Sequence, residues 1–154
     1  MSVATVSVII AAASVIAASI FYSFQIWNQT RVRRADLVMR LYATFDSLEF
    51  QEAFHRVYWA DFDGYDSLMK VLGGQRHIGT YLFTFYDQVG ILLRRGLIER
   101  DLVEMLLGNS ARQLWEKVAP VVAEARARSD DPRLYESFEY LYDTMTGSAR
   151  RPRR

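Results

Sequence analysis

The stretch EAFHRVYWADFDGYD contains two groups of side chains whose types and spacing fit metal chemistry. Glu52 and His55 lie three positions apart, so on a helix both would face one ion. A di-iron bundle needs a second Glu-x-x-His pair, but the residue three positions before the other histidine, His77, is Gly74. A mononuclear site would need a further carboxylate such as Asp87. We therefore expect this pair to be ordinary helix surface, and the alternative is a small membrane-anchored metal-dependent enzyme.

The run DFDGYD at the end of this stretch resembles part of a calcium-binding loop. If Gly64 is the sixth residue of an EF-hand loop, the first and twelfth residues are Trp59 and Lys70. Such a loop requires a carboxylate and a bidentate glutamate at these two positions. The sequence therefore favours a turn in which Asp63 caps a helix that starts at Tyr65.

The composition excludes several classes of catalytic site. The chain of 154 residues has no cysteine, so disulfides, zinc–thiolate sites, iron–sulfur clusters and cysteine nucleophiles are ruled out. The sequence also lacks the motifs of phosphate-binding loops, serine hydrolases and zinc proteases. We therefore predict a non-catalytic protein that uses no cofactor.

The first thirty residues carry no charged side chain and predict a transmembrane anchor. Residues 3–27 would span roughly 37 Å as a helix, enough to cross a hydrocarbon core of about 30 Å. Tyr22 and Trp27 lie where interfacial aromatic residues are expected. Three arginines follow them: Arg31, Arg33 and Arg34. A cleaved signal peptide is the alternative, but the basic segment that begins such peptides is missing.

The arginines on the C-terminal side of the anchor also predict its orientation. Basic residues are enriched on the cytoplasmic side of membrane helices. We therefore expect a single-pass protein of the cell membrane, with its N-terminus outside and its helical domain in the cytoplasm.

Small residues form a stripe along the predicted anchor: Ser7, Ala11, Ser14 and Ala18. Such a stripe lets helix backbones approach closely, so it favours self-association or docking to a partner helix. The alternative is that an alanine-rich helix contains such a stripe by chance.

The rest of the chain has the apolar period of helices, and no segment alternates as a strand. We expect an all-α fold, with an N-terminal transmembrane helix followed by a compact bundle of about five to six helices. The expected parts are an anchor at 1–30, a cytoplasmic helical domain at 31–146 and a basic disordered tail at 147–154. Nothing breaks the chain between residues 3 and 45, so the predicted helix at 30–45 can continue the anchor. Six further helices are predicted at residues 46–59, 65–72, 77–95, 99–107, 110–128 and 131–145.

Caps and helix breakers set the predicted ends of these helices. Asp46 begins one helix as a cap, and Gly108 ends another. Asp131 followed by Pro132 is typical of a helix start, so it should open the last helix.

Two charged features lie near the C-terminus. The last predicted helix has an acidic face that fits a basic protein partner, formed by Glu136, Glu139 and Asp143. The tail GSARRPRR carries four arginines that fit anionic lipid headgroups. They are Arg150, Arg151, Arg153 and Arg154. For both features the alternative is a solvated surface without a partner, and the absence of a basic helix face argues against a dedicated nucleic-acid binder.

Three ordered blocks of the sequence resemble a known family. FYDQVGILLRRGLIERDLV, LWEKVAPVV and RLYESFEYLYDTM are similar to a prokaryotic domain-of-unknown-function family of small single-pass membrane-anchored helical proteins. The segment RLYATFDSLEFQEAF fits the start of that family's domain after its anchor. The resemblance implies an anchor and a helical cytoplasmic domain, and it implies no activity. We expect a membrane-tethered adaptor or accessory subunit, with membrane lipid and either a protein partner or a second copy as its partners.

Overall fold

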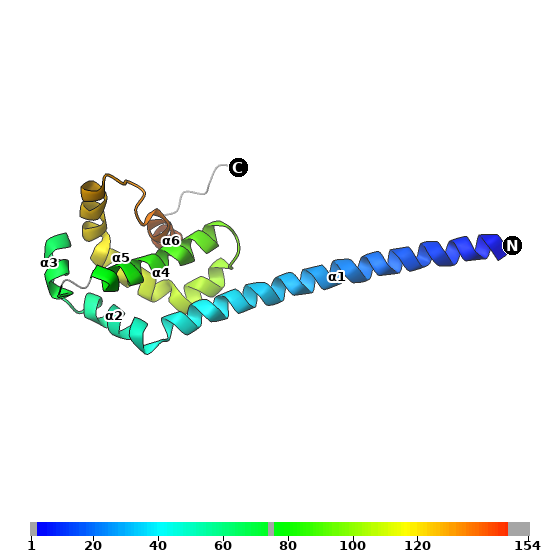
Figure 1. Cartoon of the computed structure of the whole chain (residues 1–154), viewed down its shortest axis with the longest axis horizontal. Coiled ribbons are helices and arrows are strands. Elements are labelled where there is room, and N and C mark those ends of the chain that lie inside the picture. The colour runs from blue at the N-terminus through cyan, green and yellow to red at the C-terminus, as the bar shows by residue number, and fades with distance from the viewer. Residues whose placement is uncertain (1–2, 74–75, 148–154) are drawn as a thin grey trace. The chain divides into compact units, whose positions relative to one another are not determined.

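The computed structural model describes residues 3–73 and 76–147, and the side chains of Thr5, Val8, Ile9, Ile10, Thr30, Arg31 and Arg76 are not described. The described residues form six α-helices and no strand (Figure 1). These are α1 (Val3–Phe45), α2 (Leu48–Tyr58), α3 (Tyr65–Val71), α4 (Arg76–Arg94), α5 (Arg100–Ser129) and α6 (Glu136–Thr146). The prediction of an all-α chain is confirmed. The chain divides into two compact units, residues 1–38 (unit 1) and 39–154 (unit 2).

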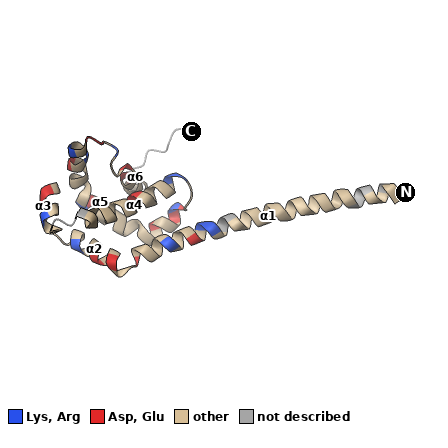
Figure 2. Ribbon diagram, viewed as in Figure 1, with Lys and Arg blue, Asp and Glu red and all other residues tan. Residues whose placement is uncertain are grey.

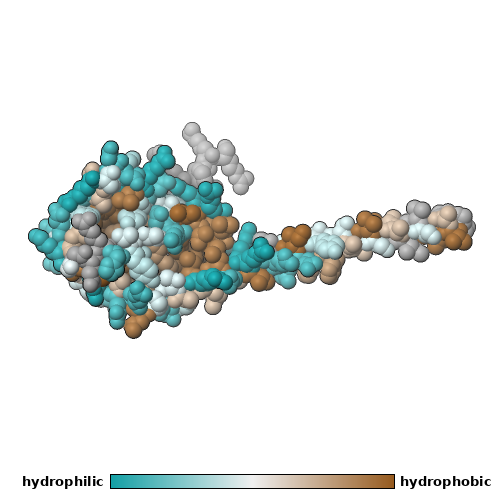
Figure 3. All heavy atoms as spheres, in the orientation of Figure 1, coloured by the Kyte–Doolittle hydropathy of each residue, from teal (hydrophilic) through white to brown (hydrophobic). Residues whose placement is uncertain are grey.

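The N-terminal part of unit 1 exposes the large apolar side chains that are described there. Between Val15 and Trp27, eight of them are 57% to 66% exposed. Figure 2 shows this stretch of α1 without charged residues, and Figure 3 shows apolar side chains along it. Within the described part of the chain, however, no helix has a run long and apolar enough to cross a membrane. The described residues therefore do not support the predicted transmembrane helix at 1–30.

Unit 2 is built around a buried cluster of aromatic side chains from four helices. The rings of Tyr86 on α4 and Phe138 on α6 stack at 4.9 Å. Trp115 on α5 meets Phe138 edge-on at 4.8 Å, and Phe50 on α2 meets Phe85 at 4.7 Å. Phe50, Tyr86 and Phe138 have no exposed surface. Burying an aromatic side chain of this size contributes roughly 1.5–3 kcal/mol, so this cluster holds the helices together.

The helices α4 and α6 approach each other closely. A Cβ atom added to Gly90 would lie 1.9 Å from the backbone oxygen of Ser137. In the sequence, Gly79, Phe83, Tyr86 and Gly90 share one face of the helix predicted at 77–95, and glycines on such a face predict close helix contact. The structure confirms this contact at Gly90. One turn earlier on α4, Asp87 Oδ1 accepts hydrogen bonds from the backbone N–H groups of Ser137 (2.9 Å) and Phe138 (3.0 Å). Asp87 therefore caps the N-terminus of α6 from a different helix.

The start of α6 differs from the prediction. The helix begins at Glu136, and the predicted cap, Asp131, instead accepts a hydrogen bond from the N–H of Arg133 in the preceding turn. Tyr135 occupies the N-cap position with a left-handed backbone (φ 56°) and makes no side-chain capping bond. The prediction from Asp131 and Pro132 was wrong by about one turn, because the capping carboxylate comes from α4.

Two more helix ends correct the sequence predictions. Ser47 caps α2 in place of Asp46, since its hydroxyl accepts the N–H of Phe50 at 3.2 Å. Gly108 does not end a helix, and α5 runs through it as one helix of 30 residues. Gly108 is buried, and a Cβ there would lie 3.5 Å from Met145 Sδ on α6. This glycine therefore serves helix packing.

A pair of glycine substitutions in α4 tests the close approach to α6. In Gly90→Ala the new methyl group meets backbone, so we expect a loss of about 2 kcal/mol or more in the free energy of unfolding. In Gly79→Ala the nearest atom is a leucine methyl group at 3.4 Å. This control should be neutral or gain up to about 1 kcal/mol from helix propensity. Urea titration followed by near-ultraviolet circular dichroism measures both, and equal values for the two variants would contradict the packing argument.

A second pair tests the cap on α6. Asp87→Ala leaves two helical N–H groups without their acceptor, so we expect it to lower the free energy of unfolding by about 2–3 kcal/mol. The matched control is Asp61→Ala, an exposed loop carboxylate, which should stay within about 0.5 kcal/mol of wild type. The same urea titration compares them, and a stability loss in the Asp87 variant no larger than in the control would refute the cap.

Candidate functional site

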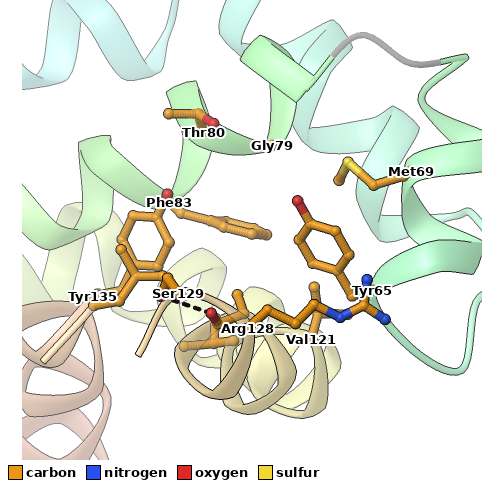
Figure 4. A pocket seen from close by; sticks show the side chains of 12 residues that line it. Tyr65, Met69, Gly79, Thr80, Phe83, Val121, Arg128, Ser129 and Tyr135 are labelled. Carbon is orange, nitrogen blue, oxygen red and sulfur yellow. Dashed lines mark hydrogen bonds between the residues drawn. The ribbon is translucent and has the colours of Figure 1, made fainter. Parts of the chain in front are cut away.

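A pocket of about 320 Å³ in unit 2 lies between α3, α4, α5 and the turn before α6 (Figure 4). Its apolar floor consists of Phe83, Val121 and Val122, which are buried. Figure 4 shows Tyr65 and Tyr135 on opposite sides, with the Tyr65 hydroxyl pointing into the space between Met69 and Phe83. The site is thus an aromatic-walled pocket with a small number of polar groups.

Tyr135 has the most strained backbone of the residues that line the pocket. Its φ of 56° lies in the left-handed region, which costs an aromatic residue on the order of 1–3 kcal/mol. Its ring packs edge-on against Phe83, with the centroids 5.5 Å apart. Burial raises the pKa of the Tyr135 phenol, and hydrogen bonding with Thr80 and Thr84 opposes this rise. These contacts hold the ring against the side of the pocket.

Arg128 lies at the opposite side and is already paired. Its guanidinium donates two hydrogen bonds of 2.7 Å to the two carboxylate oxygens of Asp66, and it lies 3.6 Å from Glu124 Oε2. The hydrogen bond from Arg128 is the main reason that the pKa of Asp66 is lowered. Arg128 also lies over the ring of Tyr65, 4.6 Å from its centroid. Two carboxylates therefore offset the positive charge at this side of the pocket.

Tyr65 is held from α5 through its backbone. Its N–H donates to Glu124 Oε2 at 3.0 Å, at the start of α3. The N-cap residue is Gly64, so the predicted cap Asp63 is corrected: its carboxylate instead accepts a hydrogen bond from the Ser67 hydroxyl. A Cβ on Gly64 would lie 2.5 Å from Glu124 Oε1, so glycine here leaves room for that carboxylate.

The lining of this pocket fits binding better than proton transfer. It contains tyrosine, threonine, serine and arginine side chains, and no carboxylate or histidine among its described residues. The hydroxyl of Ser129 is engaged with the backbone oxygen of Ala125 at 2.8 Å. Apolar walls with a few fixed polar groups are typical of small-molecule sites.

The predicted metal residues lie elsewhere, on α2. The side chains of Glu52 and His55 are both exposed, and Glu52 lines a hollow of about 210 Å³ that also includes His77. Asp87, the further carboxylate considered for a mononuclear site, caps α6. Across the described ranges, no group of three or more histidine, aspartate or glutamate side chains could hold a metal ion.

The predicted acidic partner face is largely paired within unit 2. Glu136 forms an ion pair of 3.2 Å with Arg94 on α4, and Glu139 forms one of 2.7 Å with Arg126 on α5. Burial raises the pKa of Asp143, and the charge of Glu139 adds to this rise. Two of the three carboxylates are therefore paired with arginines of neighbouring helices.

The predicted membrane residues are exposed wherever they are described. Tyr22 and Trp27 are 65% and 57% exposed. The stripe residues Ser7, Ala11, Ser14 and Ala18 are exposed in unit 1, as are Arg33 and Arg34. The side chain of Arg31 and the tail residues Arg150, Arg151, Arg153 and Arg154 lie outside the described residues.

The pocket itself was missed by the sequence predictions. Tyr65 and Tyr135 come from separate elements, and no pattern in the chain links one to the other. One pattern in the sequence bears on the pocket: Gly79 and Phe83 share a face of α4 with Gly90, next to its main apolar face. Glycines on such a face indicate packing against other helices. That signal does not indicate what the face contacts.

Comparison with known proteins gives a family and no activity. No curated protein and no solved structure shows significant similarity to the chain. Residues 2–145 match the family described as "Domain of unknown function (DUF4760)", which confirms the expectation of a domain of unknown function and does not test the expected prokaryotic origin or membrane anchor. Because the match covers most of its length, the chain belongs to the DUF4760 family.

Proposed function

We propose that this protein is a membrane-tethered, non-catalytic interaction protein, an adaptor or accessory subunit whose unit 2 is held at a bilayer by the N-terminal part of α1. The observation that carries the proposal is the exposure of apolar side chains in unit 1. Residues 3–29 carry no charge, and the large apolar side chains from Val15 to Trp27 are more than half exposed.

These side chains favour an apolar environment strongly. Removing one large apolar side chain from water is worth roughly 1.5–3 kcal/mol when burial is complete, so eight half-exposed side chains contribute on the order of 10 kcal/mol. A helix also satisfies its own backbone hydrogen bonds, as a lipid environment requires. The free energy of leaving water is therefore large enough to hold the chain at a membrane.

The distribution around the helix favours lipid over a protein groove. Successive helical residues are rotated by about 100°, so Val15, Ile16 and Phe21 point in three well-separated directions. A groove on a partner protein covers one stripe of a helix, whereas lipid surrounds it. The proposed anchor also includes Thr5 and residues 8–10, which belong to the same uncharged run in the sequence and whose side chains are not described.

The flanking residues support an orientation for this anchor. Tyr22 and Trp27 match an interfacial aromatic belt, and Arg33 and Arg34 follow on the C-terminal side. We place the N-terminus outside the cell membrane and unit 2 in the cytoplasm, because basic flanks favour the cytoplasmic side.

The interaction role belongs to unit 2. It has its own aromatic core, and the described lining of its pocket suits binding more than acid–base chemistry. A helical unit with a binding pocket, fixed to a bilayer, is suited to bringing a ligand or partner to the membrane surface. This is the role of an adaptor or accessory subunit.

Extraction from membranes tests the anchor. The wild-type chain should stay in the pellet after alkaline carbonate treatment, since its apolar helix is held by the hydrocarbon core. Ile16→Lys combined with Ile20→Lys should release it, because each charge at mid-membrane costs about 2.5–3.5 kcal/mol. The matched control, Val32→Lys beyond the predicted span, should remain in the pellet. Wild-type protein in the carbonate supernatant would refute the anchor.

Labelling of an introduced cysteine tests the orientation. The chain has no cysteine, so Asp61→Cys creates a single reactive site in an exposed loop of unit 2. A membrane-impermeant maleimide should label this site only after the cells are opened. Cysteine at Ser2, on the proposed outer side, should react in intact cells. Labelling of Cys at position 61 in intact cells would reverse the proposed orientation.

A further inference from the structure

We propose that the pocket between α3, α4 and α5 is a binding site for a small, uncharged, planar aromatic molecule that carries one hydrogen-bonding group. This site assigns a ligand class to unit 2, and the argument does not depend on how the chain is held at a membrane. It rests on the volume, the lining, the charge balance and the strain of the pocket.

The volume and the lining indicate the size and polarity of the ligand. About 320 Å³ lies at the lower end of the range of roughly 300–1,000 Å³ that is typical of small-molecule sites. Phe83 and the two valines of α5 form an apolar floor, and the rings of Tyr65 and Tyr135 stand at the sides. Aromatic rings pair favourably with other rings in stacked or edge-on geometry, so a flat aromatic molecule complements these walls.

The charges around the pocket favour an uncharged ligand. Arg128 already donates two short hydrogen bonds to Asp66 and lies close to Glu124. An anionic ligand would have to compete with these two carboxylates, and a cationic ligand would have to compete with Arg128 for them. A neutral molecule leaves this ion-paired group undisturbed.

The Tyr65 hydroxyl provides the polar contact. It points into the pocket, and Figure 4 shows no hydrogen bond from it to the other residues drawn there. A phenol hydroxyl both donates and accepts, so it can bind a ligand N–H, hydroxyl or carbonyl group. A single such contact orients a flat ligand within otherwise apolar walls.

Backbone strain beside the pocket is a separate observation that points to function. Tyr135 has a left-handed backbone although it is a bulky aromatic residue. Strained residues of this kind persist where the surrounding structure fixes them, and they cluster at ligand sites. Here the strain places the Tyr135 ring at the side of the pocket.

Binding of indole tests this proposal. Indole is uncharged, planar and aromatic, and its single N–H matches the Tyr65 hydroxyl. The full chain, labelled with ¹³C at its methionine methyl groups, is titrated in lipid nanodiscs, or in buffer if carbonate releases it. Met69 lines the pocket, and Met105 is 77% exposed on α5 and serves as the internal control. We expect the Met69 methyl signal to shift with saturation and a Kd below about 1 mM, while Met105 does not shift.

Matched variants and charged probes locate the binding. Ala125→Phe fills the pocket and should weaken indole binding at least tenfold, while Ala127→Phe, on the exposed side of the same helix, should change it less than twofold. Tyr65→Phe should weaken it roughly 3–10-fold through the lost hydrogen bond. Indole-3-acetate, which is anionic, and tryptamine, which is cationic, should each bind at least tenfold more weakly than indole.

Three results would overturn the proposal. The first is a Met69 signal that fails to move, or that moves linearly and in parallel with Met105. The second is undiminished indole binding in a folded Ala125→Phe variant. The third is a charged probe that binds as tightly as indole, which would show that the ion-paired side of the pocket does not select for neutral ligands. The wild-type titration and the charge series decide the matter even if the phenylalanine variant does not fold.

Discussion

The hydrogen bonds from the start of α6 to Asp87 are the contact on which the rest of unit 2 depends. Residue 135 provides no capping side chain of its own, and Asp87 Oδ1 accepts the N–H groups of Ser137 and Phe138 from α4. Asp87 can accept these hydrogen bonds because Gly90, one turn further along α4, has no side chain and lets the backbones of α4 and α6 pack closely. Buried N–H groups without an acceptor are costly, so the cap fixes where α6 begins. The position of α6 then brings Phe138 between Tyr86 and Trp115 in the core.

A carboxylate from another helix also caps α3, at the Tyr65 side of the pocket. Glu124 on α5 accepts the backbone N–H of Tyr65 at the start of α3, in the way that Asp87 serves α6. Arg128, one helical turn after Glu124, binds Asp66 on α3. A short helix of seven residues has little stability of its own, so these contacts with α5 set its position. Carboxylates from long helices thus place both tyrosines.

Which features the sequence could predict follows from the range of the interactions that create them. The uncharged run of unit 1 and the apolar faces of α4 and α6 are local patterns. The apolar period predicts the all-helical fold, and the glycines on one face of α4 predict the close contact at Gly90. The cap from Asp87 and the passage of α5 through Gly108 depend on residues far apart in the chain. Asp131 with Pro132, and Gly108, carry strong local signals, and tertiary contacts overrode both. The pocket was missed for the same reason, because Tyr65 and Tyr135 face the same pocket only after α3 and the turn before α6 are placed.

The strained turn before α6 implies that the pocket is formed before any ligand arrives. A left-handed Tyr135 is unfavourable in isolation, so other contacts must fix it. Three such contacts are present. The Tyr135 ring packs edge-on against Phe83, and Asp87 accepts the N–H groups of Ser137 and Phe138 just after it. Just before it, Arg126 Nε donates a 2.9 Å hydrogen bond to the backbone oxygen of Leu134. None of them involves a group that a ligand would have to displace. A site fixed in this way loses little conformational entropy on binding, so even a small molecule with few contacts can be held there.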